Sequence, residues 1–482
     1  MTEYDVIVVG AGPGGSIAAK VAAENGLKTV FFERGRKPGE KNSSGCGLGP
    51  RMWRLFPELM KELTPEVAPN LRKAGCVVNH YLNKDMDEVA LEMYRPTESV
   101  TYEPAKSFIT MNCYRSEFDP WIAHFAVDAG AELRTSVLVK DLVKDEKGKV
   151  IGVQTEKGEK ILGKIVIGAD GVISTVGIRS GLNPRWHPSQ ITLVPQYDFA
   201  APRDKIDKLF GPDAFLADAA DAVWWGVKYP AAYQVVFGDG FHIGLGSWMG
   251  QWTKNPLSHL NNLVSCKPFQ RMIKALDAKP REVQSHLLPW NHEPIKTYTD
   301  NVMLIGDAGA FPCPLEAEGV FPAMETGKLA AETAVKCIAN GDTSKQALKL
   351  YEDKWKKGSV GTEFEAGESL QTLWKNLFFS TQSEVNNMEW FIPLWHEFRG
   401  GMYDWSEPHI IRFRQIVKKI QEYLPQAMPF ASKYVMPLLS DVMGEDLSMF
   451  PQLMKMMEGM RPKKKKVEPA SLKGEAPKIE VK

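Results

Sequence analysis

The chain has 482 residues, and its 59 Lys and Arg residues balance 59 Asp and Glu residues, so the formal net charge is zero. Hydrophobic residues make up 44% and charged residues 24%, which is typical of a globular protein with two or three domains. This charge balance argues against a basic surface, so we expect no nucleic-acid partner. The start, MTEYDVIVVGAG, lacks the basic segment of a signal peptide, and no apolar stretch reaches the length of a membrane span.

The six cysteines are scattered and include no CxxC pair, which predicts a reducing compartment and no zinc site. No cysteine follows Cys337, so the C-terminal part has no thiolates to hold an iron–sulfur cluster. We therefore expect a cytoplasmic protein without a metal centre.

The N-terminus has the pattern of a strand, a tight turn, a helix and a second strand. Residues 4–9 are a continuous apolar run, the Ala-rich residues 16–24 favour a helix, and residues 28–32 form the next apolar run. The turn between the first strand and the helix is GAGPGG. This arrangement predicts a βαβ unit with a parallel sheet.

The turn contains the GxGxxG motif of dinucleotide-binding proteins. Gly10 permits the tight turn, Gly12 lets the backbone approach a pyrophosphate, and Gly15 lets the helix lie close to the strand. The helix N-terminus offers N–H groups to the phosphates. Glu33 ends the second strand, near the spacing of about 20 residues expected for a carboxylate that binds ribose hydroxyls. The motif alone fits either FAD or NAD.

Later segments follow the order of an α/β fold. Helical spacing covers residues 51–66 and 118–129, and a β-meander with Gly-containing turns covers residues 133–162. Residues 191–286 alternate and are rich in aromatic side chains, which predicts a mostly antiparallel second sheet. Residues 302–305 are a buried strand that returns to the first domain.

Two buried strands end in Gly-Asp turns, and these favour FAD over NAD. The first turn contains Asp170 and the second contains Asp307, where a carboxylate is placed to reach ribityl hydroxyls. A long helix over residues 320–339 follows, beginning after Gly319. Its positive end would face the ring system, where reduced flavin carries negative charge.

Four further segments carry a resemblance to a known family: PGEKNSSG at residues 38–45, RSEFDPWIAHFAVDAGAEL from Arg115, SHLLP at 285–289 and GKLAAE at 327–332. With the motifs above, residues 1–360 resemble FAD-dependent oxidoreductases of the para-hydroxybenzoate hydroxylase fold. Within that fold the sequence is similar to the group that joins geranylgeranyl reductases to electron-transfer-flavoprotein:quinone oxidoreductases. The resemblance implies that FAD is held by Gly10, Gly12, Gly15, Glu33, Arg115 and Asp307.

Two other segments are similar to the prenyl reductases. WGVKYP, which contains Trp225 and Tyr229, resembles their aromatic substrate-domain motif, although Val227 stands where that motif often has Trp. Trp225 and Tyr229 are therefore candidates to contact the substrate, with plain core packing as the alternative. Cys46 with Gly47 resembles a Cys-Gly pair that prenyl reductases carry near the flavin.

Two side chains are candidates for a chemical role. Cys46 is expected near the flavin, either alone or paired with Cys313, and both are also ordinary small buried residues in the alternative interpretation. Glu318 precedes the helix at 320–339 and would either relay a proton or cap that helix.

The C-terminal part has an unusual composition. Residues 343–460 are helical in pattern and rich in Trp, Phe and Met from residue 373, so they either pack on the FAD domain or dock on a membrane or partner. Residues 461–482 are rich in Lys, Pro and Glu, which predicts a disordered tail.

The sequence therefore predicts an α/β flavoenzyme with a Rossmann-like FAD-binding domain, an antiparallel-sheet substrate domain and a helical C-terminal region. The expected boundaries are 1–184 and 296–342 for the FAD-binding domain, 185–295 for the substrate domain, 343–460 for the helical region and 461–482 for the tail.

The favoured function is electron transfer between a soluble carrier, an electron-transfer flavoprotein or a ferredoxin-like protein, and a quinone-like lipophilic acceptor. The alternative is a prenyl reductase that saturates isoprenoid double bonds, and both imply peripheral membrane contact. A non-catalytic flavin-containing subunit and a flavin monooxygenase acting on an aromatic substrate also stay open.

Overall fold

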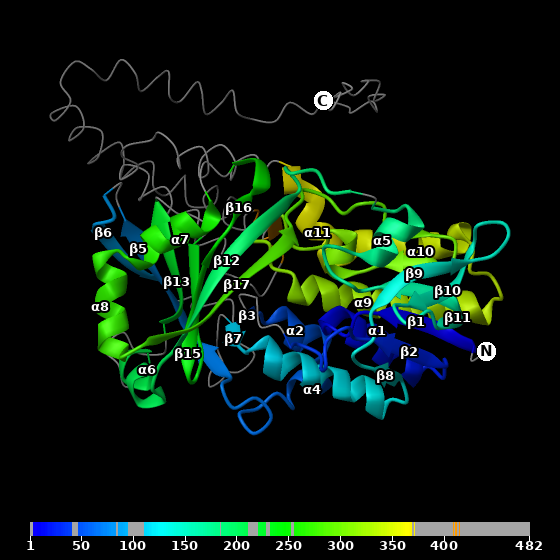
Figure 1. The fold of residues 1–482 in the computed structure, drawn as a ribbon, viewed down its shortest axis with the longest axis horizontal. Helices are drawn as coiled ribbons and strands as arrows, with labels where there is room; N and C mark the ends of the chain where they lie inside the picture. The colour runs from blue at the N-terminus through cyan, green and yellow to red at the C-terminus, as the bar shows by residue number, and fades with distance from the viewer. Residues whose placement is uncertain are drawn as a thin grey trace, which may run out of the picture. The chain divides into compact units, whose positions relative to one another are not determined.

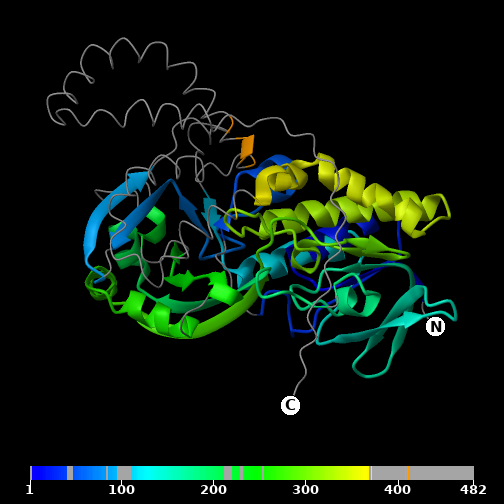
Figure 2. The same cartoon turned by 90° about the horizontal axis from the view of Figure 1, so that it is seen from above.

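The computed structural model describes residues 3–40, 47–82, 85–94, 110–183, 185–210, 220–227, 232–251, 255–368, 371, 408, 410–411 and 414. In these residues the strands form a first sheet, a second sheet and a small sheet. Figures 1 and 2 show the first sheet with helices α1, α9 and α10 on one side of this part of the chain and the second sheet on the other.

The first sheet has a parallel centre, as the βαβ pattern predicts. Its strand order is β18-β19-β11-β1-β2-β8, with the hairpin β9–β10 beside β11. β1 pairs in parallel with β2 and β11, and β11 pairs in parallel with β19. The bounds are β1 Glu3–Val9, β2 Thr29–Phe32, β8 Glu132–Arg134, β9 Val139–Lys144, β10 Val150–Thr155, β11 Lys160–Gly168, β18 Tyr298–Thr299 and β19 Val302–Leu304.

The apolar run in β1 is continuous because both faces of this strand are buried. Val6 and Val8 pack into the core beneath the helices, whereas Ile7 and Val9 pack into a second core on the opposite face. Strands buried on both faces are typical of parallel sheets covered on both sides. The helices that bury the first core are α1 Pro13–Glu24, α4 Arg115–Asp128, α9 Val320–Ala339 and α10 Lys345–Lys357.

The expected helix over residues 51–66 is wrong in part. The structure has two short helices, α2 Arg51–Leu55 and α3 Pro57–Met60, followed by turns. Proline lacks a backbone N–H and is favoured in the first turn of a helix, and here a new helix, α3, begins at Pro57.

The second sheet is mostly antiparallel and has the order β16-β12-β15-β14-β13-β5-β6, with β17 paired to β12. β5 and β6 come from residues 76–94, far from the other strands in sequence, and β5 pairs in parallel with β13. The bounds are β5 Cys76–Leu82, β6 Glu88–Tyr94, β12 Ile191–Ala200, β13 Ala220–Val227, β14 Ala232–Val236, β15 Gly240–Leu245, β16 Ser247–Trp248 and β17 Lys279–Pro289.

Three helices bury one face of the second sheet. Phe199, Phe241 and Phe269 meet in this core, with the first two rings stacked at 5.0 Å between centroids. The helices are α6 Arg203–Phe210, α7 Pro256–Val264 and α8 Lys267–Leu276. The other face of the second sheet is therefore available to line a pocket.

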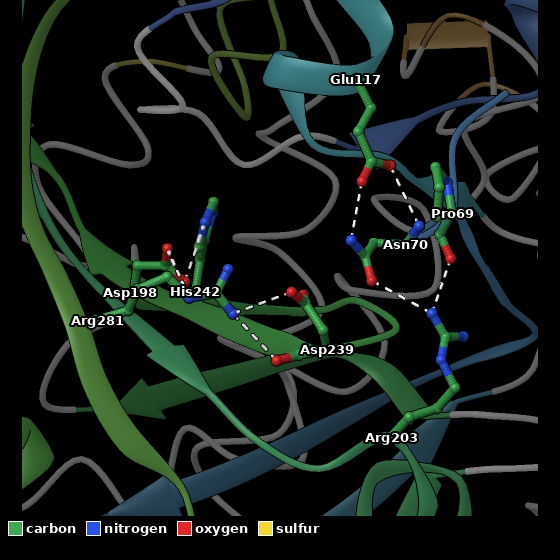
Figure 3. Close-up of polar contacts among 8 residues, drawn as sticks. All are labelled: Pro69, Asn70, Glu117, Asp198, Arg203, Asp239, His242 and Arg281. Atoms are coloured by element: carbon green, nitrogen blue, oxygen red, sulfur yellow. Dashed lines mark hydrogen bonds and ion pairs between the residues drawn. The ribbon is translucent and has the colours of Figure 1, made fainter.

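The small sheet and a polar junction connect the two larger sheets. The small sheet consists of β3 Gly47–Leu48, β7 Thr110–Asn112 and β4 Arg72–Ala74. Asn70 Nδ2 donates to Glu117 Oε1 of α4 at 2.8 Å, and Asn70 Oδ1 accepts from Arg203 Nη2 of α6 at 3.2 Å (Figure 3). The carbonyl of Asn70 also accepts from the Gly238 N–H, next to β14. Asn70 thus bridges the two halves.

Two further α-helices are α5 Thr175–Ser180 and α11 Ser359–Glu363, and short 3-10 helices cover Met249–Gln251, Gly306–Gly309 and Phe364–Ala366. The remainder of the expected helical region from residue 372, apart from 408, 410–411 and 414, lies outside the described residues, as does the expected tail. Within the described part of the chain, no helix has both the length and the apolar character needed to cross a bilayer.

Candidate functional site

A pocket of about 380 Å³ lies between the two large sheets. One wall consists of the glycine turn after β1, Arg115 of α4, the turn after β19 and the N-terminus of α9. The opposite wall consists of residues from β7, β12, β14 and β17. The two walls thus come from segments that are far apart in the sequence.

The glycine turn is built as the motif predicts. Gly10 has a φ of 107°, and a Cβ at this position would lie 2.2 Å from the carbonyl oxygen of Ala169. A Cβ at Gly15 would lie 1.9 Å from the carbonyl oxygen of Gly10. A Cβ at Gly12 would face only Arg115 Nη2, at 3.6 Å. Gly10 and Gly15 therefore shape the turn, whereas Gly12 leaves space on the pocket side.

The space beside Gly12 suits the pyrophosphate of FAD. Gly12 is the N-cap of α1 and has no side chain with which to cap the helix, so the first N–H groups of α1 face the turn with the positive end of the helix dipole. Glu33 follows β2, and its carboxylate accepts from the N–H groups of Gly35 at 2.7 Å and Ala11 at 3.4 Å. The structure therefore brings Glu33 to the edge of the glycine turn.

Arg115 adds positive charge at the same turn. Its Nε and Nη2 atoms donate to Asp119 Oδ1 and Oδ2 at 2.5 and 2.6 Å, which holds the guanidinium in place. Burial raises the pKa of Asp119, although Arg115 opposes this shift. Arg115 lies where an anionic group above Gly12 would meet it.

Asp307 and Gly319 meet in the turn between β19 and α9. A Cβ at Gly319 would lie 3.4 Å from Asp307 Oδ1, and both residues line the pocket. Burial raises the pKa of Asp307 to about 6, while Arg115 lowers it. A buried carboxylate of this kind is stabilised by hydroxyl donors, which the ribityl chain of FAD carries.

Asp170 lies between the pocket-lining residues Ala169 and Gly171, and its carboxylate bonds to the start of α5. It accepts from the Ser174 hydroxyl at 2.5 Å and from the Val176 N–H at 3.1 Å. Burial raises the pKa of Asp170 to about 6, and these hydrogen bonds oppose that shift. The contribution of Asp170 to cofactor binding stays a prediction.

Glu318 caps the N-terminus of α9, which is one of the two roles expected from the sequence. Its Oε1 accepts from the Phe321 N–H at 2.8 Å, and its main-chain carbonyl accepts from the Cys313 N–H at 2.9 Å. Glu318 also lines the pocket, so its expected role in proton transfer stays a prediction. Cys313 is buried, whereas Cys46 lies outside the described residues, so their pairing is untested.

The described part of the second-sheet wall does not test the aromatic substrate contacts that the sequence suggests. Trp225 lies in β13, but its side chain is outside the description, and Tyr229 lies outside the described residues, so both stay predictions. The described side of the wall combines polar and apolar residues, namely Thr192, Val194 and Gln196 of β12, Tyr233 and Val235 of β14, His286 and Leu288 of β17, and Trp290.

A charged cluster of residues that do not line the pocket lies on the same sheet (Figure 3). Asp198 comes two residues after Gln196 on β12, on the same face of the strand. Its carboxylate lies 3.6 Å from His242 Nε2 and 3.7 Å from Arg281 Nε. Arg281 also donates to the Asp239 carbonyl at 3.0 Å. Burial raises the pKa of Asp198 to about 6, although Arg281 lowers it.

Three residues of the pocket, Gln196, Tyr233 and His286, are not among those predicted from the sequence. The available signal was the alternation in ITLVPQYDFA, where Thr192, Gln196 and Asp198 place polar groups on one face of a strand whose ends are apolar. Polar residues at alternate positions of a buried strand indicate a site or a hydrogen-bond network.

Comparisons with known proteins identify an FAD-binding domain in this chain. A family model described as an FAD binding domain matches residues 3–204. Digeranylgeranylglycerophospholipid reductase 1 of Methanopyrus kandleri is 30% identical over 80% of this chain and 96% of its own length. The digeranylgeranylglycerophospholipid reductase of Methanocaldococcus jannaschii is 30% identical over 73% of this chain and 82% of its own length.

Solved structures share the fold. A geranylgeranyl bacteriochlorophyll reductase-like protein from Thermoplasma acidophilum superposes with a TM-score of 0.63 at 21% identity, over 88% of this chain and 99% of its own. A flavin-dependent brominase superposes with a TM-score of 0.61 at 19% identity, over 87% of this chain and 100% of its own. The fold, the cofactor and the enzyme class expected from the sequence are thereby confirmed. The chain belongs to the geranylgeranyl reductase family of FAD-dependent oxidoreductases.

Proposed function

We propose that this protein reduces the carbon–carbon double bonds of geranylgeranyl chains carried by a lipid. The observation that carries the proposal is the 30% identity to a digeranylgeranylglycerophospholipid reductase over 96% of that enzyme's length. The pocket supports it, because the residues that suit FAD occupy one wall and a second ligand has the opposite wall to contact. The relatives favour this alternative over electron transfer to a quinone.

Saturating a double bond requires a hydride and a proton. Reduced FAD, when bound, supplies the hydride. When FAD is bound, the glycine turn, Arg115 and Asp307, which line one wall of the pocket, would hold it. The N-terminus of α9 adds a positive dipole end at the same place. Glu318 and Cys46 are our proposals for the group that gives the proton.

The electrons have to come from a donor outside the pocket. The sequence contains one GxGxxG motif, at residues 10–15, and no second copy that would indicate a separate nicotinamide domain. We therefore expect a protein carrier, an electron-transfer flavoprotein or a ferredoxin-like protein, as the reductant. Because the substrate is a lipid, we also expect the protein to work at a membrane surface.

The test is anaerobic reoxidation of the dithionite-reduced, FAD-loaded protein. Addition of a geranylgeranyl glycerolipid should reoxidise the flavin and add two hydrogens to each reduced double bond, measured by absorbance and by mass spectrometry. Reoxidation by a menaquinone with no change in the lipid would contradict the proposal. In the same assay, Glu318→Gln should slow lipid reduction if Glu318 gives the proton, because the amide keeps a cap acceptor but has no acidic proton.

A further inference from the structure

The pocket wall formed by the second sheet and the small sheet contains buried polar atoms that make no hydrogen bond to any described part of the chain. Gln196 of β12 is 2% exposed and Thr110 of β7 is 1% exposed, and both line the pocket. Among the residues that the structure describes, neither Gln196 Nε2 nor Thr110 Oγ1 has a hydrogen-bond partner. Burying such groups without a partner costs about 1–3 kcal/mol each, so their presence in the pocket points to a ligand.

The orientation of the Gln196 amide is fixed by Tyr233. The Tyr233 hydroxyl donates to Gln196 Oε1 at 2.8 Å. Because the amide oxygen is used in this way, the amide nitrogen is the group left to donate to a ligand. A buried amide held at one end is preorganised for such a contact.

Gly244 makes this arrangement possible. It lies on β15 between the two residues, as the cross-strand partner of both Gln196 and Tyr233. A Cβ at Gly244 would lie 2.6 Å from the Tyr233 hydroxyl oxygen, so only glycine leaves room for the ring to reach across the strand. The contact between Tyr233 and Gln196 is therefore built into three neighbouring strands.

The position of this group favours substrate over FAD. The features that suit FAD, Gly12, Arg115 and Asp307, lie on the opposite wall of the pocket. The chemistry of the donors also restricts the ligand. Gln196 and Thr110 are neutral, and phosphate groups in proteins are usually held by Arg or Lys. A neutral acceptor oxygen suits this wall better than a phosphate.

We propose that Gln196 Nε2, positioned by Tyr233, donates a hydrogen bond to a neutral ether, hydroxyl or carbonyl oxygen at the root of the substrate's isoprenoid chain, with Thr110 Oγ1 as a second polar contact. This inference rests on the proposed function for the identity of the substrate. In this proposal the second-sheet wall distinguishes two kinds of ligand. It binds isoprenoid chains that carry an oxygen atom more tightly than plain hydrocarbon chains.

The experiment measures binding to the oxidised, FAD-loaded protein through the change in flavin absorbance. The probes are a geranylgeranyl glycerol ether, the hydrocarbon squalene and a menaquinone. Gln196→Met should weaken binding of the ether about tenfold, which is the loss expected for one buried hydrogen bond, and leave squalene binding unchanged. Tyr233→Phe should weaken ether binding by a smaller factor, because Gln196 keeps its amide but loses the partner that orients it.

Gln284→Met is the matched control, because Gln284 is the cross-strand partner of Gln196 on β17 and does not line the pocket. It should leave binding of all three probes unchanged. Equal losses for the ether and squalene in Gln196→Met, or no loss for either, would overturn the inference. If the wild type binds menaquinone and neither isoprenoid, the proposed function fails. In that case a tenfold loss of menaquinone binding in Gln196→Met would still support the hydrogen-bonding role of Gln196.

Discussion

The three glycines of the GxGxxG motif have different tasks, and the structure separates them. Side chains at Gly10 and Gly15 would collide with backbone oxygen atoms, which cannot move without opening the turn. Gly12 has an ordinary φ of −72°, and the nearest atom to its Cβ position belongs to the Arg115 side chain. The fold thus leaves room for a side chain at Gly12, and we expect only bound FAD to exclude one.

We therefore expect Gly12→Ala and Gly15→Ala to fail in different ways. Gly12→Ala should keep the melting temperature of the FAD-free protein and lower the affinity for FAD at least about tenfold, because the methyl group occupies the path of the pyrophosphate. Gly15→Ala should destabilise the fold by about 1–3 kcal/mol or more, as overpacking does. Thermal melting and FAD fluorescence titration measure the two effects. Equal melting temperatures for the two variants would contradict this assignment.

The raised pKa of Asp307 predicts that the stability of the FAD-free protein depends on pH. The folded, FAD-free protein holds the Asp307 proton up to a pH of about 6, whereas the unfolded chain releases it near its ordinary value of 3.8. Between these values the folded state binds more protons than the unfolded state, so this residue's contribution to stability falls as the pH rises. Asp307→Asn removes that dependence.

Relative to Asp307→Asn, the wild type should lose about 2 kcal/mol of stability between pH 4.5 and pH 7. The measurement is the melting temperature of both FAD-free proteins at the two pH values. The melting temperature of Asp307→Asn minus that of the wild type should be larger at pH 7 than at pH 4.5. It should not change further at pH 8. A constant difference across the whole range would show that the pKa of Asp307 is not raised.

At the scale of elements, local pattern predicts the strands and helices that have strong local signals. The helix expected over residues 320–339 is α9, and the first βαβ unit forms as its apolar runs predict. The helix expected over 51–66 breaks because Pro57 starts a new helix, a signal that was present in the sequence. What local pattern does not predict is close packing between elements. A Cβ at Gly327 of α9 would lie 2.3 Å from the carbonyl oxygen of Gly14 in α1.

At the scale of the whole molecule, local motifs in the sequence lead to the residues of one pocket wall, whereas the described residues of the other wall come together only in the fold. The FAD side is found from motifs, because the GxGxxG turn, Arg115 and Asp307 each carry a recognisable local pattern. The opposite wall depends on long-range strand pairing. β5 pairs with β13 across more than a hundred residues, and Gln196 and Tyr233 meet only because both face Gly244. Such contacts carry no local signal in one sequence.

Asn70 offers a test of how the two walls are held together. Its side chain joins Glu117 of α4 to Arg203 of α6 (Figure 3). Asn70→Ala removes both side-chain hydrogen bonds, at a cost of about 1–2 kcal/mol. Amide hydrogen exchange should then increase in α6 and around Gly238, and stay unchanged in β1 and β11.

Asn25→Ala is the control for Asn70→Ala, since Asn25 donates to the Val21 carbonyl at the end of α1 and also loses a side-chain hydrogen bond. It should leave exchange in α6 unchanged. FAD affinity should stay at the wild-type value in both variants, because the residues that suit FAD lie on the first-sheet wall. Binding of the glycerol ether should weaken in Asn70→Ala but not in Asn25→Ala. The reason is that the second-sheet wall, which carries Gln196, is then no longer held in place against the first-sheet wall. Faster exchange spread evenly over both sheets would instead mean that the halves open as one cooperative unit.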